Sequence, residues 1–92
     1  MRVLSTIGLP AACLRDIGNA VPYAEVVQLT EPADWQPAVF DADIWLAHVA
    51  QVCGMPALGA RLRWVQLSSA GAEALFVSPH IDAPVVFTNA SG

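Results

Sequence analysis

Short apolar runs alternate with helix-compatible segments along the whole chain. The apolar runs are rich in β-branched and aromatic residues, and they predict strands at residues 2–7, 24–29, 43–47, 62–67 and 84–88. Residues 9–20 have helical spacing, with Pro10 in the first turn and Gly18 near the end, and they predict a helix. This alternation is typical of βα units arranged around a parallel sheet.

The other connections are less regular. Residues 31–40 contain two prolines together with Trp35, and they predict a single helical turn with an aromatic anchor. Residues 48–60 contain two glycines and a proline, which allow at most a short helix. Residues 72–77 predict the start of one more helix before the last strand.

Right-handed crossovers between these units determine the expected topology. They predict one α/β domain over residues 1–92, an incomplete flavodoxin-like three-layer sandwich with a parallel five-stranded sheet in the order 2-1-3-4-5. Ligands of such sheets bind beyond the carboxyl ends of the strands. We therefore expect the functional site among the loops at Gly8, His48, residues 68–71 and residues 89–92.

Composition narrows the possible partners. The chain is 55% hydrophobic and only 13% charged, which is too apolar for a disordered segment and indicates apolar surface intended for a partner. Its formal net charge is −4, it has no lysine, and its four arginines form no basic stripe along the sequence. Nucleic acid is therefore excluded as the expected ligand.

Cysteine usage and hydropathy indicate an ordinary cytoplasmic domain. Cys13 and Cys53 lie far apart, with neither a C-x-x-C pattern nor a histidine at ligand spacing, so they predict no metal site. We expect both to be small buried residues in a reducing compartment. The apolar stretch at residues 44–60 is interrupted by polar residues and by Pro56, and it is too short to span a membrane.

The segment with the clearest chemistry is RLRWVQLSSAG at residues 61–71, which is followed by Glu73. A strand that runs into a turn of small residues and then a helix directs several main-chain N–H groups toward one point, where an anion can bind. The same arrangement also occurs as a simple tight turn, with Ser69 or Ala70 near the helix N-cap. The segment alone therefore leaves both interpretations open.

A second segment, VVFTNASG at residues 85–92, follows it. The two segments in this order resemble the D-isomer-specific 2-hydroxyacid dehydrogenases, and with the earlier strands the resemblance extends over essentially all 92 residues. It implies an NAD- or NADP-dependent oxidoreductase acting on the CH–OH group of D-2-hydroxy acids or on 2-keto acids. It also implies that the substrate carboxylate is bound by the main-chain amides of Ser69, Ala70 and Gly71, with His48 lining the pocket.

The resemblance covers only part of such an enzyme. The family's catalytic arginine, carboxylate and histidine lie later in the protein, and the G-x-G-x-x-G cofactor motif is absent here. We therefore expect a truncated substrate-binding lobe without the NAD-binding domain. It should bind no cofactor and no metal, should be inactive alone, and should belong to a homodimeric parent enzyme. His80 is expected in a surface turn, and the irregular residues 54–56 depart from the family pattern.

Two other functions occur with a flavodoxin-like fold, that of a receiver domain and that of an interaction module. A receiver domain needs an acidic pair, a phosphorylatable aspartate and a lysine where this chain has Gly8, His48 and Asn89, so that class is excluded. A non-catalytic flavodoxin-like module for interaction or dimerisation remains an alternative.

Overall fold

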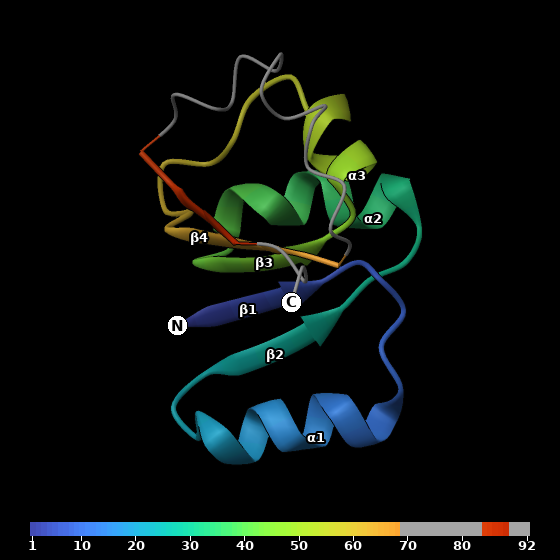
Figure 1. The fold of residues 1–92 in the computed structure, drawn as a ribbon, viewed down its shortest axis with the longest axis vertical. Helices are drawn as coiled ribbons and strands as arrows, with labels where there is room; N and C mark the ends of the chain where they lie inside the picture. Colours follow the sequence, from blue (N-terminus) through green and yellow to red (C-terminus); the bar gives the residue numbers. More distant parts are fainter. Residues whose placement is uncertain (69–83, 89–92) are drawn as a thin grey trace.

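The computed structural model describes residues 1–68 and 84–88, and they form an α/β fold around a parallel sheet (Figure 1). The sheet has five strands in the order β2-β1-β3-β4-β5, as the sequence predicts. The strands are shorter than expected, because their predicted ends lie in the connecting loops. Their bounds are β1 (Arg2–Ser5), β2 (Glu25–Gln28), β3 (Ile44–Ala47), β4 (Trp64–Leu67) and β5 (Val86–Thr88).

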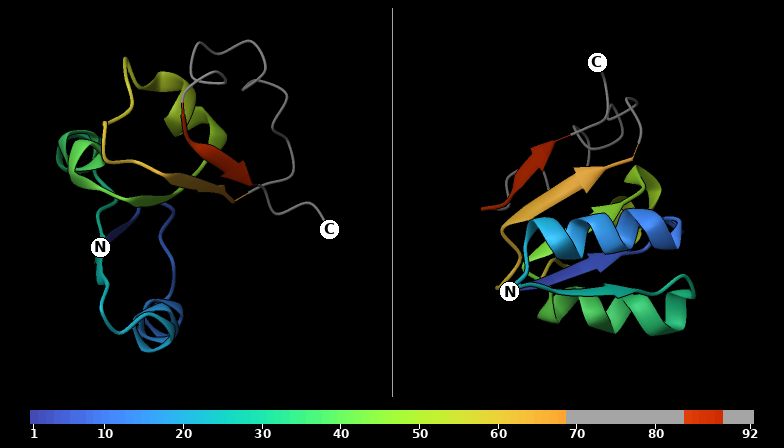
Figure 2. Two further views of the ribbon diagram at one scale, coloured as in Figure 1. Left: turned by 90° about the vertical axis from the view of Figure 1, so that its left-hand side faces the viewer. Right: turned by 90° about the horizontal axis from the view of Figure 1, so that it is seen from below.

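Helices lie on both faces of the sheet. Helix α1 (Ala11–Ala20) packs beside β2 on one face, and α2 (Pro32–Ala38) and α3 (Val49–Gly54) lie on the other (Figures 1 and 2). This division follows from the right-handed crossover connections between parallel strands. The chain crosses the sheet in one direction from β1 to β2 and in the opposite direction from β2 to β3, so the connecting helices lie on opposite faces. Within the described ranges, no helix is long and apolar enough to cross a bilayer.

The connection between β2 and β3 corrects the expectation of a single helical turn. Helix α2 continues directly into the 3-10 helix η1 (Val39–Asp41). Pro32 is tolerated because it occupies the first turn, where the N–H has no partner within the helix. Pro37 lies inside the helix and removes one main-chain hydrogen bond, and the helix ends one residue later. Trp35 is the expected aromatic anchor, and its ring packs against that of Trp45 with centroids 5.7 Å apart.

The hydrophobic core lies between the sheet and the α2–α3 layer. Leu4, Trp45 and Val65 are in register on β1, β3 and β4, and all three are almost completely buried. Val39 and Val52 cover them from η1 and α3 and are also fully buried. This face therefore supplies most of the apolar burial that stabilises the described part of the chain.

The opposite face of the sheet is less covered. Trp64 and Val86 are paired in register on β4 and β5, and they are 40% and 62% exposed. Cys13 lies exposed on α1 and Cys53 is only partly buried, so the expectation that both cysteines are buried was wrong for Cys13 and holds only in part for Cys53. The reason is that α1 turns only one narrow stripe toward the sheet, which includes the half-buried Leu14 and Ile17.

Candidate functional site

Three polar residues follow the carboxyl ends of neighbouring strands at one edge of the sheet. Thr6 follows β1, His48 follows β3 and Ser68 follows β4. The turn at Gly8 lies beyond the same end of β1, with a positive φ of 70° that glycine adopts without strain. The described part of the predicted ligand-binding edge therefore exists, and it includes the point between β1 and β3 where the strand order reverses.

His48 and Ser68 are in direct contact across this edge. The Nδ1 atom of His48 lies 2.5 Å from the Oγ atom of Ser68. The main-chain N–H of Ser68 donates to the carbonyl of Ala47 at 2.9 Å, which fixes the end of β4 against β3. If the neutral imidazole carries its proton on Nε2, its Nδ1 atom accepts a hydrogen bond from the Ser68 hydroxyl. If the proton is on Nδ1, the Nδ1–H donates a hydrogen bond to the Ser68 oxygen. The imidazole is exposed, so its outer edge is open to a ligand.

Gln51 fixes the main chain at His48. Its Oε1 atom accepts the N–H of His48 at 2.9 Å and the hydroxyl of Thr6 at 2.6 Å, while its Nε2 atom donates to the Thr6 carbonyl at 3.1 Å. The buried Thr6 hydroxyl also accepts the indole N–H of Trp45 at 3.1 Å. These bonds join the end of β1 to the start of α3, so that the position of His48 is set by a buried network.

Thr6 and Gln51 were not among the predicted site residues. One signal was available for Gln51, because a glutamine three residues after a helix N-cap commonly accepts the N-cap N–H. Nothing in the sequence marks Thr6 as its partner, since the two residues are 45 positions apart.

Gln28 holds the neighbouring loop after β1. Its Oε1 atom accepts the main-chain N–H of Leu9 at 2.7 Å, and its Nε2 atom donates to the Leu9 carbonyl at 2.9 Å. The hydroxyl of Ser5 donates to the same Oε1 atom at 2.9 Å. The chain on either side of Gly8 is therefore bound to β2, and the edge is preorganised at two of its loops.

This geometry does not test the predicted carboxylate-binding residues. His48 lies at the edge as expected, next to Ser68, whereas Ser69, Ala70 and Gly71 and residues 89–92 lie outside the described residues. The contacts made by Thr6, Gln51, His48 and Ser68 involve amide, hydroxyl and imidazole groups. Such groups suit a polar or anionic ligand held by hydrogen bonds.

The described turn between β1 and α1 does not match a dinucleotide-binding turn. A dinucleotide-binding turn needs several glycines and free main-chain N–H groups between a strand and its helix. The turn between β1 and α1 has a single glycine, Gly8, and Pro10 has no N–H to offer. Within residues 1–68 and 84–88, no group of three or more His, Cys, Asp or Glu side chains could hold a metal ion.

Comparison with known proteins finds no relative of this chain. No protein-family model matches the chain, and neither a curated protein nor a solved structure is significantly similar to it.

Proposed function

We propose that this chain is the substrate-binding lobe of an NAD- or NADP-dependent D-2-hydroxyacid dehydrogenase. The observation that carries the proposal is the contact between His48 and Ser68 where β3 and β4 end. It lies at the edge where sheets of this order bind ligands, and immediately before the turn whose sequence resembles that family.

The proposed role is to hold the carboxylate of a 2-keto or 2-hydroxy acid. The main-chain N–H groups of Ser69, Ala70 and Gly71 would donate to the carboxylate oxygens, and such charge-assisted bonds are strong. The bond from Ser68 to Ala47 supports this role, because it fixes the residue from which the turn starts. His48 is suitably placed for a further hydrogen bond to the acid from its exposed ring.

The remaining chemistry would come from parts of the enzyme outside these 92 residues. Reduction of a 2-keto acid requires a hydride donor, a cation that polarises the carbonyl and a proton donor. We propose that a separate nucleotide domain binds NAD or NADP and contributes these groups, in a cytoplasmic homodimer. The 92-residue chain by itself is then expected to show no NADH-dependent turnover of pyruvate, glyoxylate or hydroxypyruvate.

Direct binding of a hydroxy acid tests the proposal on the chain itself. Lactate, titrated into the isotope-labelled chain, should shift the amide signals of residues 68–71 and the ring signals of His48 in a saturable way. Lactamide, which lacks the carboxylate charge, should not. Ala70→Pro removes one donor N–H and should weaken lactate binding by about tenfold or more, the effect of losing a charge-assisted hydrogen bond worth ~1.5–3 kcal/mol.

The same substitutions test the role in catalysis once the nucleotide domain is present. Ala70→Pro or Gly71→Val should lower kcat/KM by about 10- to 150-fold, whereas Ser68→Ala should matter less, since the carboxylate is held by main-chain groups. If Ala70→Pro folds normally and keeps kcat/KM within about twofold, the turn is only structural and the proposal fails.

The exposed Trp64 and Val86 favour one second candidate, an interaction or dimerisation module. On that view the open face of β4 and β5 binds another protein surface. Self-association that is abolished by Trp64→Lys, together with no response to lactate, would support this candidate over the dehydrogenase lobe.

A further inference from the structure

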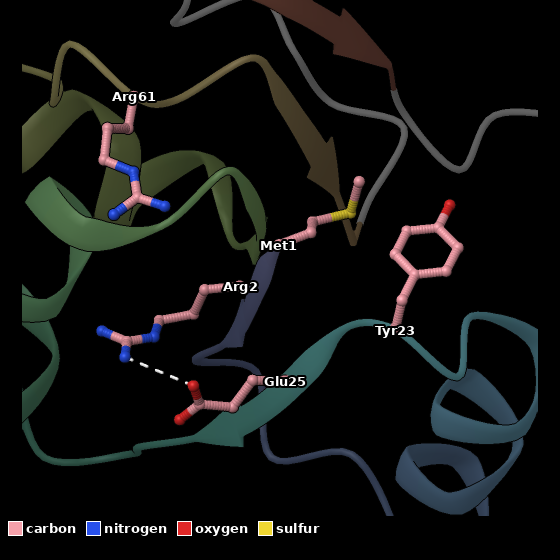
Figure 3. A pocket seen from close by; sticks show the side chains of 5 residues that line it. All are labelled: Met1, Arg2, Tyr23, Glu25 and Arg61. Atoms are coloured by element: carbon pink, nitrogen blue, oxygen red, sulfur yellow. Dashed lines mark hydrogen bonds and ion pairs between the residues drawn. The ribbon is translucent and has the colours of Figure 1, made fainter.

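The opposite, amino-terminal edge of the sheet contains a pocket of about 250 Å³. It is lined by Met1, Arg2, Tyr23, Glu25 and Arg61 (Figure 3). The first strands β1 and β2 begin here, and Arg61 precedes β4, so the pocket is separated from His48 and Ser68 by the length of the strands.

Positive charge gathers around this pocket although the chain as a whole is acidic. Three of the four arginines surround Asp43: Arg2 donates its main-chain N–H to it, Arg61 forms an ion pair with it, and Arg63 lies close enough to influence its charge. The arginines form no stripe along the sequence, but the fold brings them to one edge. In a protein of formal net charge −4, such focusing favours an anionic ligand at this place.

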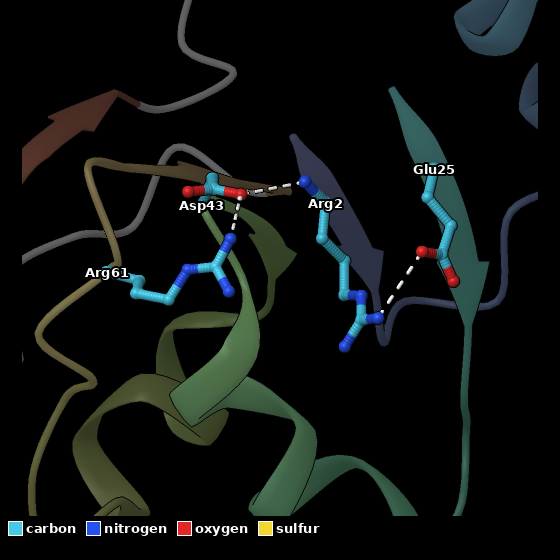
Figure 4. Close-up of polar contacts among 4 residues, drawn as sticks. All are labelled: Arg2, Glu25, Asp43 and Arg61. Carbon is cyan, nitrogen blue, oxygen red and sulfur yellow. Dashed lines mark hydrogen bonds and ion pairs between the residues drawn. The ribbon is translucent and has the colours of Figure 1, made fainter. Parts of the chain in front are cut away.

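Two carboxylates position the guanidinium groups of the pocket. The Nη2 atom of Arg2 lies 3.3 Å from Oε2 of Glu25, and the Nη2 atom of Arg61 lies 3.4 Å from Oδ2 of Asp43 (Figure 4). Asp43 also accepts the main-chain N–H of Arg2 at 2.7 Å, and this bond, with the nearby arginines and the terminal amino group, lowers the pKa of its carboxyl. Asp43 is thus ionised at neutral pH and keeps Arg61 at the pocket.

Among the described residues, most donors of the Arg2 and Arg61 guanidinium groups have no protein partner and are available for a ligand. A guanidinium has five N–H donors, and these contacts use one nitrogen of each arginine. The side chains of Arg2 and Arg61 are 40% and 61% exposed, and exposed pairs of this kind add only about 0–1 kcal/mol to stability. The stability that these two ion pairs add to the fold is therefore too small to explain why the arginines gather at the pocket.

We propose that this pocket binds a single anionic group, a phosphate or a carboxylate, on a small organic molecule. The forks of Arg2 and Arg61 would bind its oxygens, a geometry that guanidinium groups match well. Met1 and Tyr23, which are 51% and 73% exposed, offer apolar surface to the rest of the ligand across the pocket (Figure 3). The carboxylate of Glu25 on the rim disfavours a ligand with several separated negative charges.

Phenyl phosphate, benzoate and inorganic phosphate are the probes that test this proposal. Titrated into the labelled chain, phenyl phosphate or benzoate should shift the signals of Arg2, Tyr23 and Arg61 with a dissociation constant on the order of 1–10 mM. The tighter of these two identifies the anion as phosphate or carboxylate. Inorganic phosphate should bind more weakly than phenyl phosphate, and Tyr23→Ala should reduce that difference.

Matched arginine variants distinguish binding at this pocket from a general effect of the protein's net charge. Arg61→Gln should weaken binding at least fivefold, and Arg61→Lys, which keeps the charge but loses the fork, should weaken it less. Arg15→Gln removes the same charge from α1, away from the pocket, and should leave binding within twofold. Asp43 keeps its bond from the Arg2 main chain in the Arg61 variants, and a dispersed amide spectrum verifies their fold.

The proposal is overturned if none of the probes binds saturably. It is also overturned if Arg15→Gln and Arg61→Gln weaken binding equally, which would show an effect of net charge alone. Shifts confined to His48 and residues 68–71 would assign the anion to the carboxyl edge and likewise overturn it. The two edges carry different residues, so either proposal can fail without the other.

Discussion

The two edges of the sheet use polar side chains in opposite ways. At the carboxyl edge, Thr6 and Gln51 form a partly buried network of neutral groups, and their two bonds to each other join segments distant in sequence. At the amino edge, Arg2 and Glu25 form an exposed ion pair between neighbouring strands. The contrast indicates that the partly buried neutral groups hold the main chain in position. The exposed ion pair contributes little stability, and most N–H donors of its arginine stay available for a ligand.

The energetics of the two environments explain the contrast. A buried polar group that loses its partner costs about 1–3 kcal/mol, because neither protein nor water replaces the bond. An exposed ion pair is screened by water, and its loss costs about 0–1 kcal/mol. Substitutions at the two edges should therefore differ in size, and four of them test this, from the largest expected effect to the smallest.

Thr6→Val should cause the largest loss. It removes the hydroxyl that accepts the Trp45 indole N–H and donates to Gln51, so the buried indole N–H loses its partner and the half-buried Gln51 amide loses one of its donors. We expect the free energy of unfolding to fall by about 2–4 kcal/mol, measured by urea denaturation. Thr30→Val, at an exposed position, is the control and should change it by less than about 0.5 kcal/mol. Equal effects of the two would contradict the role of the network.

Gly59→Ala should cause the next largest loss. Gly59 is buried just before Arg61, and an added Cβ would lie 2.7 Å from the Cα atom of Phe40. Because main-chain atoms cannot move aside as a side chain does, we expect a loss of about 1–3 kcal/mol in the same measurement. Gly54→Ala has open space around the new methyl group and should cause no loss. If the two variants are equally stable, the loop before Arg61 is not held in place by the close approach of Gly59 to the main chain of Phe40.

Asp43→Asn should cause a smaller and pH-dependent loss. At pH 7 we expect about 1 kcal/mol, because the asparagine still accepts the Arg2 main-chain N–H but has no charge. The folded-state pKa of Asp43 lies below its ordinary value, so its ionisation stabilises the protein above about pH 4 and this stability is lost as the pH falls through the folded-state pKa. The difference between wild type and variant in urea denaturation should therefore shrink from pH 7 to pH 3. A difference that stays constant would show that the charge is unimportant.

Glu25→Gln should have the smallest effect. It removes the partner of the Arg2 guanidinium at an exposed position, and we expect a loss below about 0.5 kcal/mol. Urea denaturation at low and high salt measures it, and wild type and variant should converge as salt increases. A loss well above 1 kcal/mol would mean that the pair stabilises the fold, and the comparison of the two edges would no longer hold.

The strand order was predictable because it depends on local pattern and chain handedness. The alternation of apolar runs with helical segments defined the βα units, and right-handed crossovers left one simple order for them. The same reasoning placed Gly8, His48 and Ser68 at one edge, since residues that follow parallel strands share an edge. Element ends were less predictable: the prolines of residues 31–40 indicated one turn, yet burial of Trp35 supports a longer helix.

Side-chain partners were decided only by the tertiary structure. The contacts of Thr6 with Gln51 and of Arg61 with Asp43 join residues 45 and 18 positions apart. The exposure of Cys13 likewise depends on how α1 is turned toward the sheet. Periodicity reports which face of an element is apolar, but it contains no information on which polar groups of separate elements meet. The sequence by itself thus determined the sheet and which loops share its carboxyl edge, whereas packing decided the network at that edge and the arginine pocket opposite it.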